Sequence, residues 1–83
     1  MILVNYFARY REQLGSGGEK LHLDADLHTV DDVRQLLMAR GETWATVLGE
    51  SSLMCALNQD LCKLDAVIED FDEIAFFPQV TGG

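Results

Sequence analysis

Near its start the chain reads Ile2-Leu3-Val4-Asn5-Tyr6-Phe7-Ala8, a run of β-branched and aromatic side chains with a single polar residue. A nearly continuous apolar run of this length is typical of a central strand that is covered on both faces or close to it. A second run, Glu73-Ile74-Ala75-Phe76-Phe77, lies at the other end of the chain and is followed by Pro78, which ends a strand ladder. We therefore expect the first and last strands to be central neighbours in one sheet, and parallel pairing fits that arrangement.

Between these two runs the sequence predicts one principal helix. Thr29 is a good N-cap, and Asp32 three residues later completes a pattern that resembles a capping box. Apolar residues at helical spacing follow, Arg40 is expected in the last turn, and Gly41 supplies the stop. The other predicted elements are a short helix at 9–14, a glycine-rich loop at 15–18, strands at 20–24, 53–57 and 61–64, and a second short helix at 42–48.

One main helix and about five short strands predict an α+β fold, in which a mixed sheet packs on that helix. The β-grasp has this arrangement. With 83 residues the chain has room for one domain, which we expect at 1–78, followed by a flexible C-terminal tail at 79–83. Because side chains alternate along a strand, Phe7 and Phe77 are expected to point away from the helix. An exposed aromatic pair of this kind usually marks an interface.

The composition narrows the classes of function. The net charge is −8, from 14 acidic and 6 basic residues, and the basic residues form no cluster. This argues against nucleic acids and anionic membranes as partners, and it favours a basic protein surface. The chain has no apolar run long enough to span a membrane and no signal-peptide core, so a cytoplasmic location is expected.

The residue types that hold metals are few. Cys55 and Cys62 lie seven residues apart, and His22 and His28 are at no zinc-site spacing, so no metal site is expected. A disulfide is disfavoured in the cytoplasm. Both cysteines are therefore interpreted as small core hydrophobes.

The chain ends in Gly82-Gly83. Glycine has no Cβ, so this backbone can enter a slot too narrow for other residues. The terminal carboxylate is a poor acyl donor, but adenylation by a second enzyme would turn it into a reactive mixed anhydride, and sulfur could then replace AMP to give a thiocarboxylate. The alternative reading is an inert, disordered end.

A family resemblance favours the reacting terminus over the inert end. The segment 72–83, Asp-Glu-Ile-Ala-Phe-Phe-Pro-Gln-Val-Thr-Gly-Gly, resembles the tail of the small, sulfur-carrying subunits of molybdopterin synthase. Similarity continues over nearly the whole chain, in segments 4–8, 11–12, 29–30 and 56–59. The resemblance implies a ubiquitin-like β-grasp whose terminal glycine is adenylated by an ATP-dependent activating enzyme and then thiocarboxylated. The loaded tail would give its sulfur to cyclic pyranopterin monophosphate in molybdenum cofactor biosynthesis.

The resemblance also assigns roles to residues. Gly83 would carry the thiocarboxylate, Gly82 would allow access, and Val80 and Thr81 would line the tail channel. An apolar patch of Phe7, Leu61 and Phe77 would hold both partners: the activating enzyme and the large synthase subunit, with which the carrier forms a heterotetramer. The active site would lie in that large subunit, and the carrier would hold no permanent cofactor and no metal.

Two residues depart from the family pattern. Gln79 stands where the family usually has a second proline, which should loosen the extended tail. Phe71 stands where a glycine commonly precedes Asp-Glu, which puts the geometry of that turn in question. Other functions stay open beside the leading one: a sulfur carrier for thiazole synthesis or tRNA thiolation, a modifier joined to lysines through Gly83, or an interaction domain with an inert tail.

Overall fold

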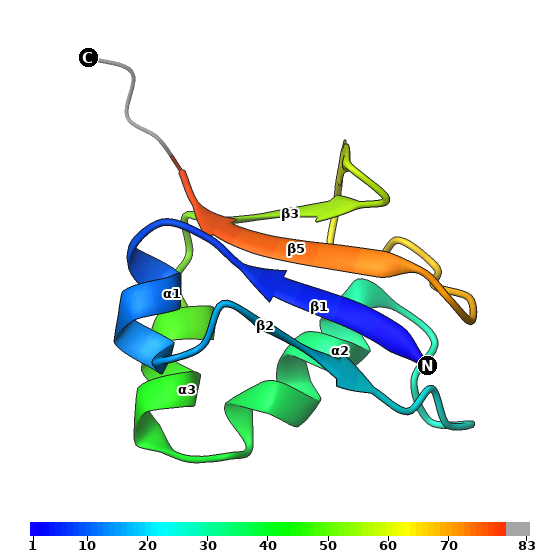
Figure 1. Cartoon of the computed structure of the whole chain (residues 1–83), viewed down its shortest axis with the longest axis horizontal. Coiled ribbons are helices and arrows are strands. Elements are labelled where there is room, and N and C mark those ends of the chain that lie inside the picture. Colours follow the sequence, from blue (N-terminus) through cyan, green and yellow to red (C-terminus); the bar gives the residue numbers. More distant parts are fainter. Residues whose placement is uncertain (80–83) are drawn as a thin grey trace.

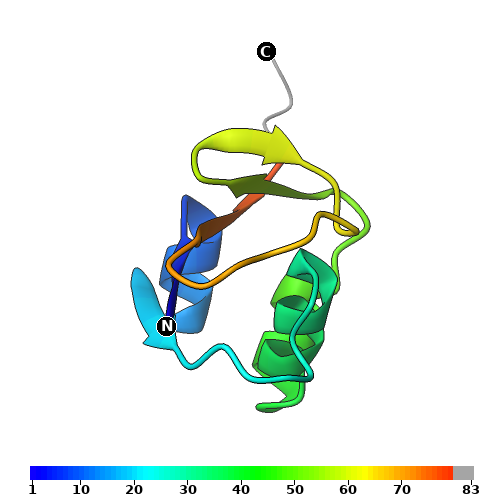
Figure 2. The same ribbon diagram turned by 90° about the vertical axis from the view of Figure 1, so that its right-hand side faces the viewer.

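The computed structural model describes residues 1–79. The two most apolar runs form the central pair of a five-stranded sheet, and helices pack on one side of it (Figures 1 and 2). In chain order the elements are β1 (Ile2–Tyr6), α1 (Arg9–Leu14), β2 (Gly18–Leu21), α2 (Val30–Met38), α3 (Glu42–Leu48), β3 (Leu53–Leu57), β4 (Asp60–Cys62) and β5 (Glu73–Pro78).

The sheet has the strand order β2-β1-β5-β3-β4 (Figure 1). β1 and β5 are parallel, with Val4 opposite Ile74 and Tyr6 opposite Phe76, and the other three pairings are antiparallel. The expectation that the first and last strands are central neighbours is confirmed. The α+β β-grasp architecture is confirmed with it.

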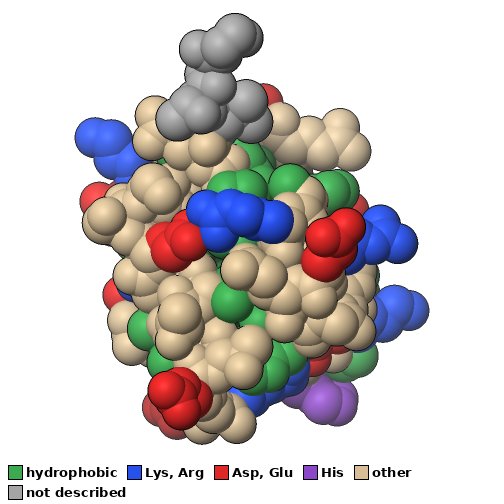
Figure 3. Space-filling model, turned by 90° about the vertical axis from the view of Figure 1, so that its left-hand side faces the viewer, with side chains coloured by type: hydrophobic (Ala, Val, Ile, Leu, Met, Phe, Trp, Pro, Cys, Tyr) green, Lys and Arg blue, Asp and Glu red, His purple; other side chains and the backbone are tan. Residues whose placement is uncertain are grey.

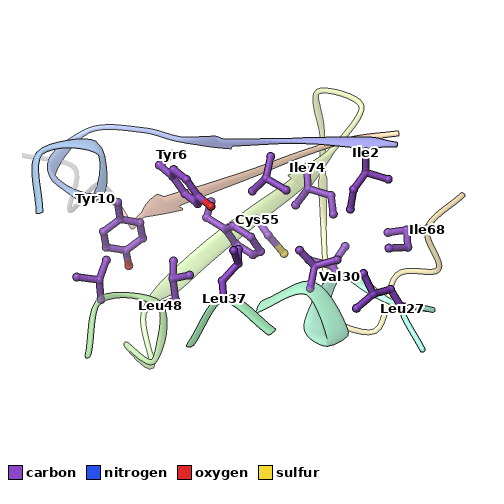
Figure 4. Packing of buried hydrophobic residues seen from close by; sticks show 14 residues of the cluster. Ile2, Tyr6, Tyr10, Leu27, Val30, Leu37, Leu48, Cys55, Ile68 and Ile74 are labelled. Carbon is purple, nitrogen blue, oxygen red and sulfur yellow. The ribbon is translucent and has the colours of Figure 1, made fainter. Parts of the chain in front are cut away.

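The core lies between the sheet and the helices (Figure 4). Along β1 the alternation is strict, because Ile2, Val4 and Tyr6 are buried while Leu3 and Asn5 are half-buried. The strand is thus covered fully on one face only, and the other face stays partly open. Each fully buried aliphatic or aromatic side chain stabilises the fold by roughly 1.5–3 kcal/mol. The opposing helical side chains that complete the core include Val30, Val33, Leu37, Val47 and Leu48.

The start of α2 is the predicted capping box. Thr29 Oγ1 accepts a hydrogen bond from the Asp32 N–H at 3.2 Å, and Asp32 Oδ2 accepts one from the Thr29 N–H at 3.0 Å. The His28 N–H donates to the same carboxylate oxygen at 2.8 Å. The hydrogen bonds from the His28 N–H, which contributes most, and from the Thr29 N–H lower the pKa of Asp32. They fix where the helix begins.

The end of α2 differs from the prediction. The helix stops at Met38, so Arg40 is not in its last turn, and Gly41 serves as the N-cap residue of α3 with φ 153°. Arg40 turns toward the sheet and donates to both carboxylate oxygens of Glu19, at 2.7 and 2.6 Å. Its guanidinium also lies 4.7 Å from the ring centroid of Trp44. Arg40 therefore ties the helical layer to β2.

Two strands begin earlier than predicted. β2 runs over Gly18–Leu21 instead of 20–24, because Gly18 packs directly on β1: a Cβ there would lie 2.6 Å from Asn5 Oδ1. β4 runs over Asp60–Cys62 instead of 61–64. The connecting residues Asn58 and Gln59 both have positive φ, as in the two-residue type I′ hairpin loop. A loop this short leaves Asp60 paired with Leu57.

No helix in the part of the chain from residue 1 to residue 79 has the length and apolar character needed to cross a bilayer.

Candidate functional site

The candidate site is the sheet face that the helices leave uncovered, called the outer face below. Phe77 lies on it between two inward residues of β5, Phe76 and Pro78, and is half-buried. Phe7 follows the end of β1, continues the parallel ladder through its N–H to the Phe76 carbonyl at 3.1 Å, and is 47% exposed. The outward direction predicted for Phe7 and Phe77 is confirmed.

Strand register places further apolar side chains on the same face. Met54 is directly opposite Phe77, and Ala56 is opposite Ala75. Met54 was missed by the sequence reasoning, although the alternation along β3 contains the signal. The outer face therefore has a row of large apolar side chains, Phe7, Phe77 and Met54, beside a row of small side chains.

Leu61 lies at the far end of the row of small residues. It pairs with Ala56 across the β3–β4 hairpin and is 69% exposed. Since adjacent strands are about 4.8 Å apart, β4 lies roughly 10 Å from β5. The structure thus places Phe7, Leu61 and Phe77 on one face, with the two aromatic residues close together and Leu61 separated from them by Ala56.

A hydrogen-bonded anchor holds the β3–β4 hairpin, and with it Leu61, against β5. The Asn58 N–H donates to the Glu73 carbonyl at 2.7 Å, and the Glu73 N–H donates to Asn58 Oδ1 at 2.9 Å. Asn58 Nδ2 also donates to Asp72 Oδ1 at 2.9 Å. Asn58 has φ 51°, a conformation that asparagine tolerates better than most residues. This one side chain therefore sets both the hairpin turn and its position beside β5.

The turn before β5 explains the unusual Phe71. Phe71 has φ 71° and is 86% exposed. It is the third residue of a turn that closes through the Asp72 N–H and the Glu69 carbonyl at 3.2 Å. Its own N–H donates to the Met1 carbonyl at 2.8 Å. A positive φ at this position favours glycine, so Phe71 is strained in this turn.

Helix α1 lies beside the end of the outer face that carries Phe7 and Phe77. The chain leaves β1 through Ala8, which has φ 55°. Arg9 then donates to both carboxylate oxygens of Glu50 at 2.7 and 2.8 Å, and the Tyr10 hydroxyl donates to Glu50 Oε2 at 2.7 Å. The guanidinium of Arg9, followed by the Tyr10 hydroxyl, lowers the pKa of Glu50 to about 2. The cluster fixes α1 to Glu50, which lies three residues before the start of β3.

Little in the described part of the chain suggests catalysis. Among residues 1–79 no three His, Cys, Asp or Glu side chains gather in a way that could hold a metal ion. His22 and His28 are exposed. Cys55 is buried in the core as predicted, while Cys62 is half-buried at its edge. The helical end of the molecule carries charged side chains of both signs and only scattered apolar areas (Figure 3).

The predicted reacting segment, Val80, Thr81, Gly82 and Gly83, lies outside the described residues. Its roles stay predictions. β5 ends at Pro78, opposite Leu53, and this segment begins two residues later in the sequence, at Val80.

Comparisons with known proteins agree with this architecture. The ThiS family matches residues 4–83. The chain is 42% identical to the molybdopterin synthase sulfur carrier subunit of Escherichia coli strain K12, and 41% identical to the protein of the same name in a Haemophilus influenzae strain. Both alignments cover 83 residues and the whole of each chain.

Solved structures share the fold. The crystal structure of SAMP1 from Haloferax volcanii is 26% identical, with a TM-score of 0.74, and the alignment covers 99% of this chain and 98% of that one. A chain in the complex of subunits 1 and 2 of molybdopterin-converting factor from Helicobacter pylori is 24% identical, with a TM-score of 0.65 and coverage of 99% and 97%. The full-length match to the family and to its curated relatives shows that this chain belongs to the ThiS family.

Proposed function

We propose that this chain is the sulfur carrier subunit of a molybdopterin synthase. The observation that carries the proposal is the 42% identity to a curated carrier subunit over all 83 residues, which include the C-terminal Gly82-Gly83. The geometry supports it, because Phe7, Leu61 and Phe77 lie on one sheet face that the helices leave uncovered, and this face adjoins the end of β5. In this function the domain positions a reacting terminus, and the reaction takes place in other subunits.

The reaction begins at the Gly83 carboxylate. A carboxylate oxygen attacks the α-phosphorus of ATP in a separate activating enzyme, which releases pyrophosphate and leaves an acyl adenylate. A sulfur donor then displaces AMP, and the product is a thiocarboxylate. In the large synthase subunit this sulfur passes to cyclic pyranopterin monophosphate. ATP is thus used by the activating enzyme, and the carrier itself holds no permanent cofactor.

The described residues supply recognition. Phe7, Leu61 and Phe77 present an apolar surface that both the activating enzyme and the large subunit would cover in turn. Large aromatic side chains are frequent binding anchors, because they bury much area at low entropic cost. The same face adjoins the end of β5, so a partner that covers it is close to the start of the tail. Gly82 would let the terminus enter a narrow channel, and Val80 and Thr81 would line that channel.

The net charge of −8 supports basic partner surfaces, which would speed the encounter. The fold shared with a chain of the Helicobacter pylori complex supports a large-subunit partner. A heterotetramer of two carriers and two large subunits is the assembly that we propose.

The test is the intact mass of the full chain after co-expression with its activating enzyme and a sulfur source. We expect a gain equal to the exchange of one oxygen for one sulfur. Deletion of Gly83 should abolish the gain without unfolding the domain, since the tail contributes no described core residue. Gly82→Val is a second test variant. It keeps the chain length and the terminal carboxylate but adds bulk, so it should block sulfur transfer in the synthase. Sulfur transfer at the wild-type level by the variant that lacks Gly83 would contradict the proposal.

A second candidate function is that of a protein modifier joined to lysines through Gly83. The observation that favours it is the fold shared with SAMP1, a small archaeal modifier protein. The two functions differ in the product. Covalent adducts between this chain and other proteins would favour the modifier, while a thiocarboxylate without adducts would favour the sulfur carrier.

A further inference from the structure

The two cysteines face one another across the β3–β4 hairpin. Cys55 and Cys62 are directly opposed in the antiparallel register, and their Sγ atoms are 3.6 Å apart. The Cys55 thiol also donates to the Cys62 carbonyl at 3.3 Å. Opposed residues of an antiparallel pair have Cα atoms about 4.5–5.5 Å apart, which lies within the range that a disulfide spans. For a covalent bond the two sulfurs would have to approach from 3.6 Å to about 2.05 Å.

The two thiols are not equally accessible. Cys55 is 3% exposed and belongs to the core, where Figure 4 shows its sulfur among the apolar side chains. Burial, and to a lesser extent the hydrogen bond with the Cys62 thiol, raises the pKa of Cys55 to about 12. Cys62 is half-buried and lies on β4, which is the edge strand of the sheet. An oxidant can therefore reach Cys62 first.

We propose that Cys55 and Cys62 form a redox-active dithiol pair that closes to an intramolecular disulfide in the presence of a low-molecular-weight disulfide such as oxidised glutathione. The Cys62 thiolate attacks the oxidant, forms a mixed disulfide and releases one thiolate. Cys55 then loses its proton, and its sulfur attacks Cys62 Sγ and displaces the second thiolate. Two protein thiols lose two electrons and two protons, and one small disulfide is reduced to two thiols.

The bond would tie the edge strand to the sheet. β4 has only three residues, and Leu61 lies between its two ends. Side chains alternate along a strand, so the disulfide forms on the core side and leaves Leu61 on the outer face. Oxidation thus fixes the hairpin without covering the candidate docking surface. This inference does not depend on the proposed sulfur-carrier function.

The test compares the folded and unfolded full chain in glutathione redox buffers. After acid quenching and alkylation of free thiols, intact mass separates the dithiol, the mixed disulfide and the intramolecular disulfide. A disulfide that stabilises the folded state forms, by linkage, more readily in the folded chain than in the unfolded chain. The entropy of closing the eight-residue loop from Cys55 to Cys62 predicts that the equilibrium constant for disulfide formation is up to roughly 60-fold larger in the folded chain. A folded-to-unfolded ratio of equilibrium constants above about ten supports the proposal, and a lower ratio overturns it.

A matched variant keeps two cysteines but separates them. In Cys62→Ala combined with Lys63→Cys, the second thiol moves to the adjacent exposed residue, past the end of β4. We expect this variant to show no more than a fifth of the wild-type preference for closure in the folded state. Closure equal to that of the wild type would show that simple proximity in sequence suffices, and it would refute the role of the sulfur contact.

Discussion

Truncation of Phe77 tests the outer face as a docking surface. Phe77 is half-buried and lies opposite Met54, in the row of large apolar side chains that Phe7 begins. A central aromatic anchor of an interface contributes about 2 kcal/mol or more to binding, so Phe77→Ala should raise the Kd for the large synthase subunit about 30-fold. The domain should stay folded, because Phe77 is not part of the core and truncation of a half-buried side chain costs about 1 kcal/mol.

The assay is isothermal titration calorimetry with the large subunit, with the free energy of unfolding of each variant measured separately in urea. Phe71→Ala is the matched control, since it removes the same side chain from the other end of the sheet, where Phe71 is 86% exposed. That change should leave the Kd within about twofold, as expected for a residue outside the interface centre. If Phe77→Ala binds as tightly as the wild type, or if Phe71→Ala weakens binding equally, the assignment of this face is wrong.

Three further changes test the local geometry. Phe71→Gly should raise the free energy of unfolding by about 0.5–1 kcal/mol in a urea titration, because relief of the positive φ outweighs the added entropy of an unfolded glycine; no gain would mean that the turn is not strained. Asn58→Ala should lower it by about 1–2 kcal/mol, through the lost side-chain hydrogen bonds and the positive φ of the new alanine, whereas Asn58→Gly should lose less; equal losses would remove the conformational part of this explanation. Glu50 has a pKa lowered from 4.5 to about 2, so its pairing stabilises the fold above pH 4.5 and is lost as the pH falls toward 2. Thermal unfolding of Glu50→Gln from pH 2 to 7 should therefore show a smaller loss of Tm on acidification than the wild type, and parallel curves would exclude this role.

Several features of the fold could be predicted because local patterns determine them. The apolar runs at both ends of the chain predicted the central strands, and the spacing of Thr29 and Asp32 predicted the start of α2. Alternation along β1 and β5 predicted that Phe7 and Phe77 point outward. In each of these cases the information lies within a few consecutive residues, and the tertiary structure does not oppose it.

The features that were missed depend on contacts between distant segments. β2 begins at Gly18 because its backbone packs against Asn5, a contact that no local pattern contains. Arg40 looked like a helix-terminal residue, but it pairs with Glu19, 21 positions earlier. Asn58-Gln59-Asp60 marked a turn after β3, but Gln59 has a positive φ without being Gly or Asn, so the two-residue length of the loop was not predicted. The outer face was found in part: alternation along β3 could have placed Met54 on it, but only the register of β3 against β5 places Met54 beside Phe77.

The parallel pairing of β1 with β5 has a consequence for how the chain folds. Leu3 is paired with Glu73, so the centre of the sheet joins segments separated by most of the sequence. A nascent chain that still lacks residues 73–78 has no strand to place between β1 and β3. The entropic cost of this long loop closure must be met before the central contacts form, which slows folding relative to domains with local pairing. The central pairing of the sheet therefore cannot form until residues 73–78 have been synthesised.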